Sequence, residues 1–181
     1  MATTVRIGPD NGRLLLRTGR KGLAAPAGHD LTIEITRWSG ELVLADDVAA
    51  STVTITAETG SLRVIEGKGG AIALSERDKR EIAATTRRLL DSDHQPEARF
   101  TSDKITRTDG DGTVAGTLTL LGQDRPFQMR VSQPGENRFL GTGTVIQSDY
   151  GIKPYTAMLG ALKLADPVVV EAVIDLSGAG R

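Results

Sequence analysis

The chain has 181 residues, no cysteine, and 22 basic against 23 acidic side chains, a formal net charge of −1. The length favours a single domain, the missing cysteines exclude disulfides and thiolate metal sites, and the balanced charge gives no basic footprint for nucleic acid. No apolar run approaches the roughly 20 residues of a membrane span, so stable membrane insertion is not expected. The opening residues, MATTVRIGPDNG, lack the apolar stretch of a signal peptide, which predicts a cytoplasmic protein.

The amino-terminal part of the chain carries the two-residue period of β-strands. Within 30–38 and 51–58, apolar residues alternate with threonine and other polar residues, so each segment has one apolar face. Threonine and β-branched residues suit a pleated surface. Shorter strand candidates are 14–18, 41–45 and 61–67.

One stretch follows the helical period instead. Ser75 can cap a helix, with Asp78 three residues later in the position of a weak capping box. Ile82 and Leu89 belong to a narrow apolar stripe, and the other faces are charged. The pattern predicts one main α-helix at about 76–91, whose stripe packs on the sheet.

The carboxy-terminal half returns to strands. Strong alternation marks 116–121 and 126–132, which we interpret as two strands joined by a polar turn. Further strands are expected at 98–106, 138–149 and 167–176.

A second, short helix is expected at about 154–162, because Pro154 suits a first helical turn. The whole pattern gives roughly eight to ten strands beside the main helix, which fits either a sandwich or a closed barrel. The GTG at 141–143, inside a strand pattern, is either part of a turn or marks the kind of bend that barrels need.

The sequence shows no recognisable catalytic motif. His29 and Asp30 are adjacent in a predicted strand, so their side chains point to opposite faces and cannot pair as a base and its orienting acid. Asp91, Asp93 and His94 are expected to form a solvated helix end, since a metal site needs three or four converging ligands. Because we find no nucleophile elbow, P-loop or dinucleotide fingerprint, we expect no enzyme activity, metal or cofactor. The basic cluster at 17–22 is interpreted as a solvated loop, with phosphate contact at a barrel mouth as the alternative.

Four segments in order resemble the YceI-like family of polyisoprenoid-binding proteins. They are GHDLTIEITRW, then ALSERDKREI with LLDSDHQPEARFTS, then VAGTLTLLGQDRPFQMRV, and finally IQSDYGI. The resemblance runs from about 27 to 176 within the single domain expected for 1–181. It implies a mainly β fold, an extended antiparallel eight-stranded lipocalin-like β-barrel whose lumen holds a long isoprenoid chain. It also implies a homodimer, and family members are often secreted or periplasmic.

We therefore expect a non-catalytic carrier for a hydrophobic small molecule, a long-chain isoprenoid lipid of the quinone or polyprenyl phosphate type. Two other classes stay open: a stress-linked interaction module with a solid core, and an enzyme acting on a lipid within the barrel. Only six aromatic residues are present, which is compatible with an unfilled interior, although aliphatic side chains can also fill a small barrel. The residues expected to line the lumen are Leu31, Ile33, Ile35, Val53, Ile55, Ile82, Leu89, Phe100, Leu118, Leu120, Phe127, Met129, Tyr155 and Met158.

Overall fold

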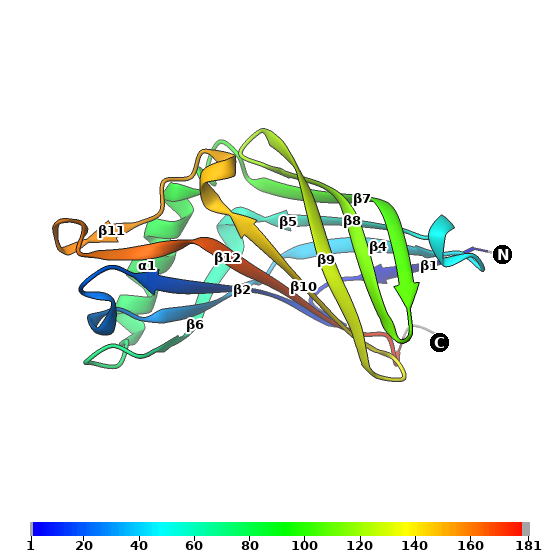
Figure 1. The fold of residues 1–181 in the computed structure, drawn as a ribbon, viewed down its shortest axis with the longest axis horizontal. Helices are drawn as coiled ribbons and strands as arrows, with labels where there is room; N and C mark the ends of the chain where they lie inside the picture. Colours follow the sequence, from blue (N-terminus) through cyan, green and yellow to red (C-terminus); the bar gives the residue numbers. More distant parts are fainter. Residues whose placement is uncertain (1, 179–181) are drawn as a thin grey trace.

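The computed structural model describes residues 2–178 and shows one antiparallel sheet curled around an interior, with one α-helix near one end (Figure 1). The strands are β1 (Thr3–Ile7), β2 (Gly12–Lys21), β3 (Asp30–Ile35), β4 (Trp38–Leu44), β5 (Thr52–Glu58), β6 (Leu62–Lys68), β7 (Glu97–Thr108), β8 (Asp111–Leu120), β9 (Gln123–Gly135), β10 (Arg138–Ile146), β11 (Thr156–Ala157) and β12 (Leu162–Asp175). The helix is α1 (Glu76–Leu89), and the 3-10 turns are η1 (Ala25–Ala27), η2 (Val48–Ala50), η3 (Thr59–Ser61), η4 (Gln147–Tyr150) and η5 (Met158–Gly160).

The sheet returns on itself through one interrupted strand. From β4 the ladder passes through β5, β7, β8, β9, β10, β12 and β2 to β3, and β3 runs on into β4 across Thr36 and Arg37. One half of this long strand pairs with β2 and β6, and the other half pairs with β1 and β5. The expected antiparallel barrel fold is therefore confirmed.

Residues 2–178 form twelve strands where eight were expected. The difference arises because β1–β2, β3–β4 and β5–β6 are each one long run broken by a short turn, and because β11 is an additional two-residue strand. When the interrupted runs are joined across these breaks, they and the remaining long strands make up the eight strands of the barrel.

The sheet opens at the end where the helix lies. β5 pairs with β7, but the chain that continues β5, as β6, pairs only with β3 on the described path of the sheet. Helix α1 packs on β6 there and takes the place that another strand would occupy (Figure 1). We call this the helical end, and we call the opposite end, where the β4–β5, β7–β8 and β9–β10 turns lie, the far end.

Helix α1 is confirmed, and its ends follow from local chemistry. The Ser75 hydroxyl accepts a hydrogen bond from the Asp78 backbone N–H at 3.1 Å, and the Asp78 carboxylate accepts one from the Ser75 N–H at 2.8 Å. Arg87, in the last turn, donates to the carbonyl oxygens of Gly60 and Leu62 at 2.9 and 3.1 Å. The capping box satisfies the first turn of the helix, the Leu90 and Ser92 N–H groups donate to the Thr86 and Arg87 carbonyls at its end, and Arg87 attaches its final turn to the start of β6.

The expected second helix at 154–162 is wrong. In its place β11 pairs with the start of β12, with Thr156 opposite Lys163, and the backbone turns tightly between them. Met158, Leu159 and Gly160 have φ values of 51°, 56° and 87°, which no right-handed helix contains. The Leu164 N–H donates to the Tyr155 carbonyl at 2.9 Å, so strand pairing satisfies the backbone groups that a helix would have used.

The far half of the interior is filled. Trp38, the only tryptophan, is buried there with Ile7 and Ile174, and its ring fits because Gly12 has no side chain in the space that it occupies. Nearer the middle, the rings of Phe100 and Phe127 meet edge to face, with centroids 5.8 Å apart. Most of the large aromatic side chains therefore close the barrel at this half, and the helical half has mainly aliphatic walls.

A substitution at Ala83 tests how α1 packs on the sheet. It is the one buried residue of the helix, so replacing it with leucine should overpack the contact with the sheet and lower the free energy of unfolding by about 1–3 kcal/mol. Arg88→Leu, on the exposed face of the same helix, is the matched control and should change it by less than about 0.5 kcal/mol. Urea unfolding measures both, and equal stability of the two variants would show that the helix does not pack through Ala83.

Candidate functional site

A cavity of about 580 Å³ lies inside the helical half of the barrel, beneath α1. Its size is within the range of about 300–1,000 Å³ that is usual for small-molecule pockets. Strands β2, β3, β5, β7, β8, β9, β10 and β12 and helix α1 all contribute to its wall. The wall is mostly aliphatic, because the inward positions of these strands carry Leu, Ile, Val and Ala.

All but two of the residues expected to face the lumen line this cavity. Val53 is half-buried on the inner face of β5, but it packs against the core beyond the cavity floor. Met158 is 61% exposed on the turn between β11 and β12, because the helix expected there does not form. The expected residues that do line the cavity are Leu31, Ile33, Ile35, Ile55, Ile82, Leu89, Phe100, Leu118, Leu120, Phe127, Met129 and Tyr155. Their role in binding a ligand stays a prediction.

Strands β2 and β12 also contribute to the wall, which was not predicted from the sequence. Leu14 and Leu16 on β2, and Val168 and Val170 on β12, line the cavity. The alternation is hidden in both strands, since LLL and VVV place apolar residues on the outer face as well. The outward Leu15 is buried all the same. The inward face of the two strands could have been inferred only by pairing them with the segment 30–38, whose alternation is clear.

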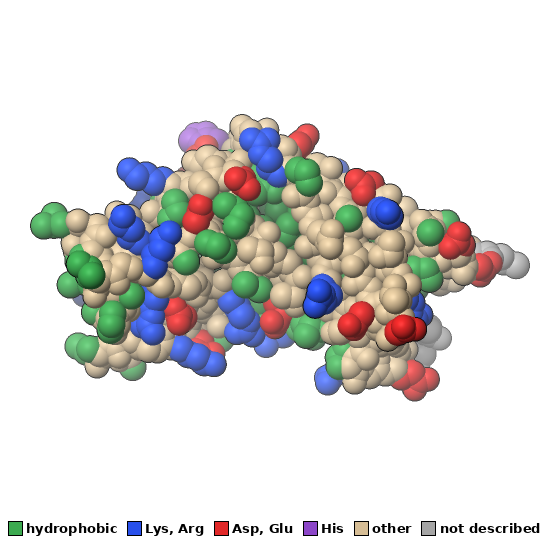
Figure 2. Space-filling view, in the orientation of Figure 1, with side chains coloured by type: hydrophobic (Ala, Val, Ile, Leu, Met, Phe, Trp, Pro, Cys, Tyr) green, Lys and Arg blue, Asp and Glu red, His purple; other side chains and the backbone are tan. Residues whose placement is uncertain are grey.

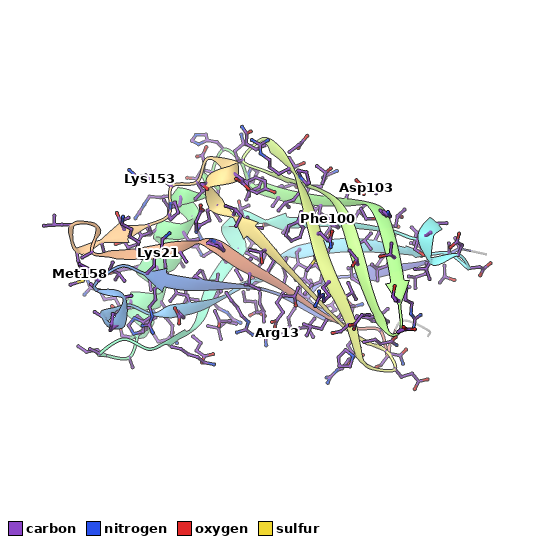
Figure 3. The ribbon with its side chains drawn as sticks, viewed as in Figure 1. Arg13, Lys21, Phe100, Asp103, Lys153 and Met158 are labelled. Carbon is purple, nitrogen blue, oxygen red and sulfur yellow. The ribbon has the colours of Figure 1, made fainter. Side chains whose placement is uncertain are left out.

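The two ends of the cavity differ in chemistry. Phe100, Phe127 and Met129 form an apolar floor, and Figure 3 shows Phe100 inside the barrel. The opposite end, which we call the mouth, is lined by polar residues that include Arg20 and His29. The lining positions of β2 run from Leu14 near the floor to Arg20 at the mouth, a depth of about 20 Å at the rise of an extended strand.

Hydrogen bonds hold the polar groups of the mouth in place. The Arg20 guanidinium donates to the Gly28 carbonyl and lies 3.4 Å from the Asp30 carboxylate, and His29 Nε2 lies 2.8 Å from the Ile72 carbonyl oxygen. Hydrogen bonds from the hydroxyl and backbone N–H of Ser75 keep the pKa of Asp78 below its usual value, so its carboxylate stays charged near neutral pH.

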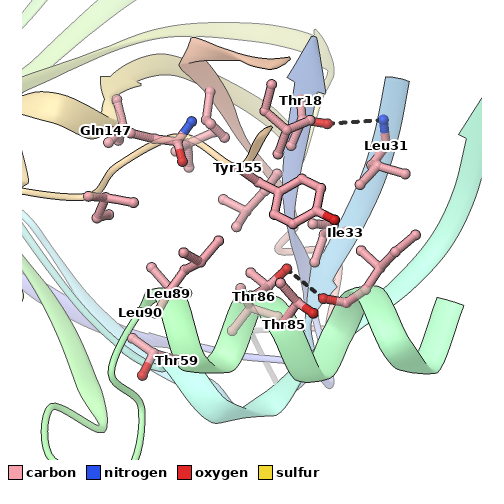
Figure 4. Close-up of a pocket in the computed structure, with 18 of the residues that line it drawn as sticks. Thr18, Leu31, Ile33, Thr59, Thr85, Thr86, Leu89, Leu90, Gln147 and Tyr155 are labelled. Atoms are coloured by element: carbon pink, nitrogen blue, oxygen red, sulfur yellow. Dashed lines mark hydrogen bonds between the residues drawn. The ribbon is translucent and has the colours of Figure 1, made fainter. Parts of the chain in front are cut away.

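Several polar side chains within the wall bond to the backbone. Thr18 Oγ1 accepts from the Leu31 N–H at 3.1 Å, and Thr86 Oγ1 donates to the Ile82 carbonyl at 2.8 Å (Figure 4). The Gln147 side-chain amide donates to two carbonyls at the bulge of β12, at 3.0 and 3.2 Å. Because these groups already have backbone partners, the interior below the mouth offers an apolar surface.

The structure brings together few groups that could perform chemistry. Among residues 2–178 there is no group of three or more His, Asp and Glu side chains that could hold a metal ion. His94 Nδ1 lies 2.7 Å from the Asp91 carboxylate, which raises the pKa of His94, but both side chains are exposed outside the cavity. Within the basic cluster at 17–22, Arg17 binds Glu171 on the outer surface, Arg20 reaches the mouth, and Lys21 is exposed.

No helix in the described part of the chain is long and apolar enough to cross a membrane.

The comparisons with known proteins give the family. The family model of the YceI-like domain matches residues 21–176, so the chain belongs to the YceI-like family, as the sequence segments predicted. No curated protein gives a significant match.

Solved structures of the same fold have distant sequences. BcnA of Burkholderia cenocepacia is 13% identical, with a TM-score of 0.67, over 93% of this chain and 98% of its own. A polyisoprenoid binding domain from Saccharophagus degradans, implicated in plant cell wall breakdown, is 14% identical, with a TM-score of 0.57, over 96% and 97%. The YceI protein of Campylobacter jejuni is also 14% identical, with a TM-score of 0.60, over 79% and 82%. At these identities the likeness shows the fold.

The cavity makes a prediction about tryptophan substitutions. Leu120 lines the empty space, so in Leu120→Trp the indole should enter the cavity at a cost below about 1 kcal/mol in the free energy of unfolding. Leu62 is only 1% exposed and lies outside the cavity wall, so Leu62→Trp should overpack solid core and cost about 1–3 kcal/mol or more. Urea unfolding compares the two, and similar large losses in both would mean that the space beside Leu120 does not exist in solution.

Proposed function

We propose that the protein is a non-catalytic carrier that holds a long-chain isoprenoid lipid, of the quinone or polyprenyl phosphate type, with its tail in the cavity and its head group at the mouth. The observation that carries the proposal is a deep, mostly apolar cavity with an apolar floor and charged groups at its mouth. The likeness to a polyisoprenoid binding domain supports this class of ligand.

The energetics favour a tail of limited length. Each CH₂ group that leaves water contributes about 0.8 kcal/mol, so one isoprene unit contributes several kcal/mol before the costs of binding. The gain ends where the tail reaches the mouth, at a depth of about 20 Å along β2. Units beyond that depth stay in water and add little affinity.

The mouth offers both signs of charge to a head group. Arg20 and His29 suit a phosphate or a quinone oxygen, whereas the charged Asp78 on the same rim opposes a second negative charge. Arg20 is already engaged with Asp30 and the Gly28 carbonyl, so the head group competes for it. Head-group selectivity is therefore expected to be modest beside the effect of the tail.

The other two functions have less support. A solid core does not fit a cavity of about 580 Å³. An enzyme would need an acid–base pair aimed into the cavity. At the mouth, His29 lies against the Ile72 carbonyl, Asp78 accepts hydrogen bonds from Ser75, and Glu81 pairs with Arg77. The cytoplasmic location stays a prediction from the sequence.

Tail length provides the test. Displacement of a dansyl-labelled prenol should show affinity that rises from farnesol to geranylgeraniol and then changes little for solanesol, because the longer tail exceeds the cavity. Leu120→Trp should weaken all three by at least tenfold, and Leu44→Trp, on the surface of β4, is the matched control that should not. Affinity that is independent of tail length, or equal in the two variants, would reject the carrier.

We also propose a homodimer, on the family resemblance alone. Light scattering at micromolar concentration should then give about twice the chain mass of 19.2 kDa. A mass equal to that of one chain throughout the concentration range would exclude the dimer.

A further inference from the structure

Large apolar side chains are exposed on three loops at the helical end. Leu23, on the β2–β3 loop, is 97% exposed, Ile72, on the β6–α1 loop, is 81% exposed, and Leu159, on the β11–β12 turn, is fully exposed next to Met158. A folded surface seldom presents several such side chains together without a partner. We call the three segments that carry them, 21–28, 67–75 and 151–163, the tip.

The three segments are held together as one surface. The Ala24 N–H donates to the Ala161 carbonyl at 3.0 Å, which joins the first segment to the third. His29, next to the first segment, binds the Ile72 carbonyl of the second at 2.8 Å. The exposed apolar residues therefore project from a connected platform, which is visible at the left of Figures 1 and 2.

The turn that carries Leu159 is built at a conformational cost. Met158 and Leu159 both have positive φ, at 51° and 56°, a region that bulky residues seldom adopt. Asparagine or glycine would suit these positions better, and neither side chain is buried in return. No packing within the described residues accounts for leucine at this place.

The charges of the tip have one sign. Its three segments contain no Asp or Glu, and they contain four lysines, Lys21, Lys68, Lys153 and Lys163, all exposed. Four carboxylates of neighbouring elements have cationic partners: Asp30 with Arg20, Glu66 with Lys68, Glu76 with Lys79 and Glu81 with Arg77, at 3.4, 3.4, 2.9 and 3.0 Å. Asp78, at the mouth, accepts hydrogen bonds from Ser75 and keeps its negative charge. Figure 3 places Lys21 and Lys153 at this end together with Met158.

The far end has the opposite character. Its turns at 45–51, 108–112 and 133–137 carry five acidic residues, Asp46, Asp47, Asp109, Asp111 and Glu136, and no Lys or Arg. The turns of the far end are therefore acidic where the tip is basic, although Arg107 and Arg138 adjoin these turns and the net charge of the chain is −1. Near a negatively charged surface, this difference in charge orients the tip toward the surface and the far end away from it.

We infer that the tip is a docking surface for an anionic lipid bilayer. Apolar side chains with a ring of lysines are what a peripheral protein uses to enter the head-group region, with the apolar groups among the acyl chains and the lysines at the phosphates. The mouth opens among the same loops, since Leu74, Tyr155 and Leu162 of the tip and the adjacent Arg20 line the cavity. Docking there places the cavity entrance against the bilayer. The inference goes beyond the carrier function, and it is tested without any prenyl ligand.

Flotation with vesicles tests it. The protein should bind vesicles of equal parts phosphatidylcholine and phosphatidylglycerol, bind pure phosphatidylcholine at least tenfold more weakly, and lose affinity as salt is raised. Leu23→Ser/Ile72→Ser/Leu159→Asn and Lys153→Glu/Lys163→Glu should each lose at least tenfold. The matched controls, Leu44→Ser and Lys104→Glu/Arg107→Glu on β4 and β7, should bind like the wild type. These substitutions are at exposed positions, so melting temperatures should stay close to that of the wild type.

Tryptophan fluorescence is a second measurement, and it locates the contact with the bilayer. Trp38 is buried, so a tryptophan added at Leu159→Trp should dominate any change in emission on vesicles, with a blue shift and quenching by brominated lipid, whereas Leu44→Trp should show neither. Wild-type protein that ignores anionic vesicles, or tip variants that bind them as well as the controls do, would overturn the inference. Tip substitutions that halve the mass in solution without changing vesicle binding would show that the tip contacts a second copy instead.

Discussion

The cavity depends on how the sheet closes. The long β3–β4 strand pairs with β2 and β6 at one end of the barrel and with β1 and β5 at the other, so the ladder is complete around the middle of the molecule. At the helical end β6 has no second strand beside it on the described sheet path, and α1 packs there. A helix is wider than a strand, so it spans this gap but stands away from the opposite wall. The space below it is the cavity.

Side-chain size decides which half of the barrel is filled. Trp38, Phe100 and Phe127 occupy the far half and the middle, where Gly12 and Gly143 leave room for their rings. The helical half has mostly Leu, Ile, Val and Ala on its walls, and Thr18 and Thr86 there are bonded to the backbone. The interior that results is apolar and open to the outside at one end, the arrangement that a lipid tail requires.

The main helix and most of the cavity wall could be predicted from the sequence pattern, because strands such as 30–35 alternate strictly and so reveal which residues face inward. The pattern fits a sandwich as well as a barrel, and the barrel was predicted from the resemblance to the YceI-like family. The inner faces of β2 and β12 could not be predicted, because the apolar runs LLL in β2 and VVV in β12 do not alternate. The second helix was predicted wrongly because local preference at 154–162 lost to the pairing of β11 with β12. Val53 shows a further limit, since alternation gives the face of a strand but not the depth at which the cavity ends.

The central claim is that a prenyl tail occupies the space beneath α1. Methyl NMR on isotope-labelled Leu, Ile and Val during titration with geranylgeraniol tests it most directly. The account predicts the largest shifts at Leu16, Ile33 and Ile82 in the cavity wall, with little change at Leu62 in the solid core. Shifts confined to the exposed Leu23 and Leu159, or no shifts at the cavity methyl groups at saturating ligand, would contradict it.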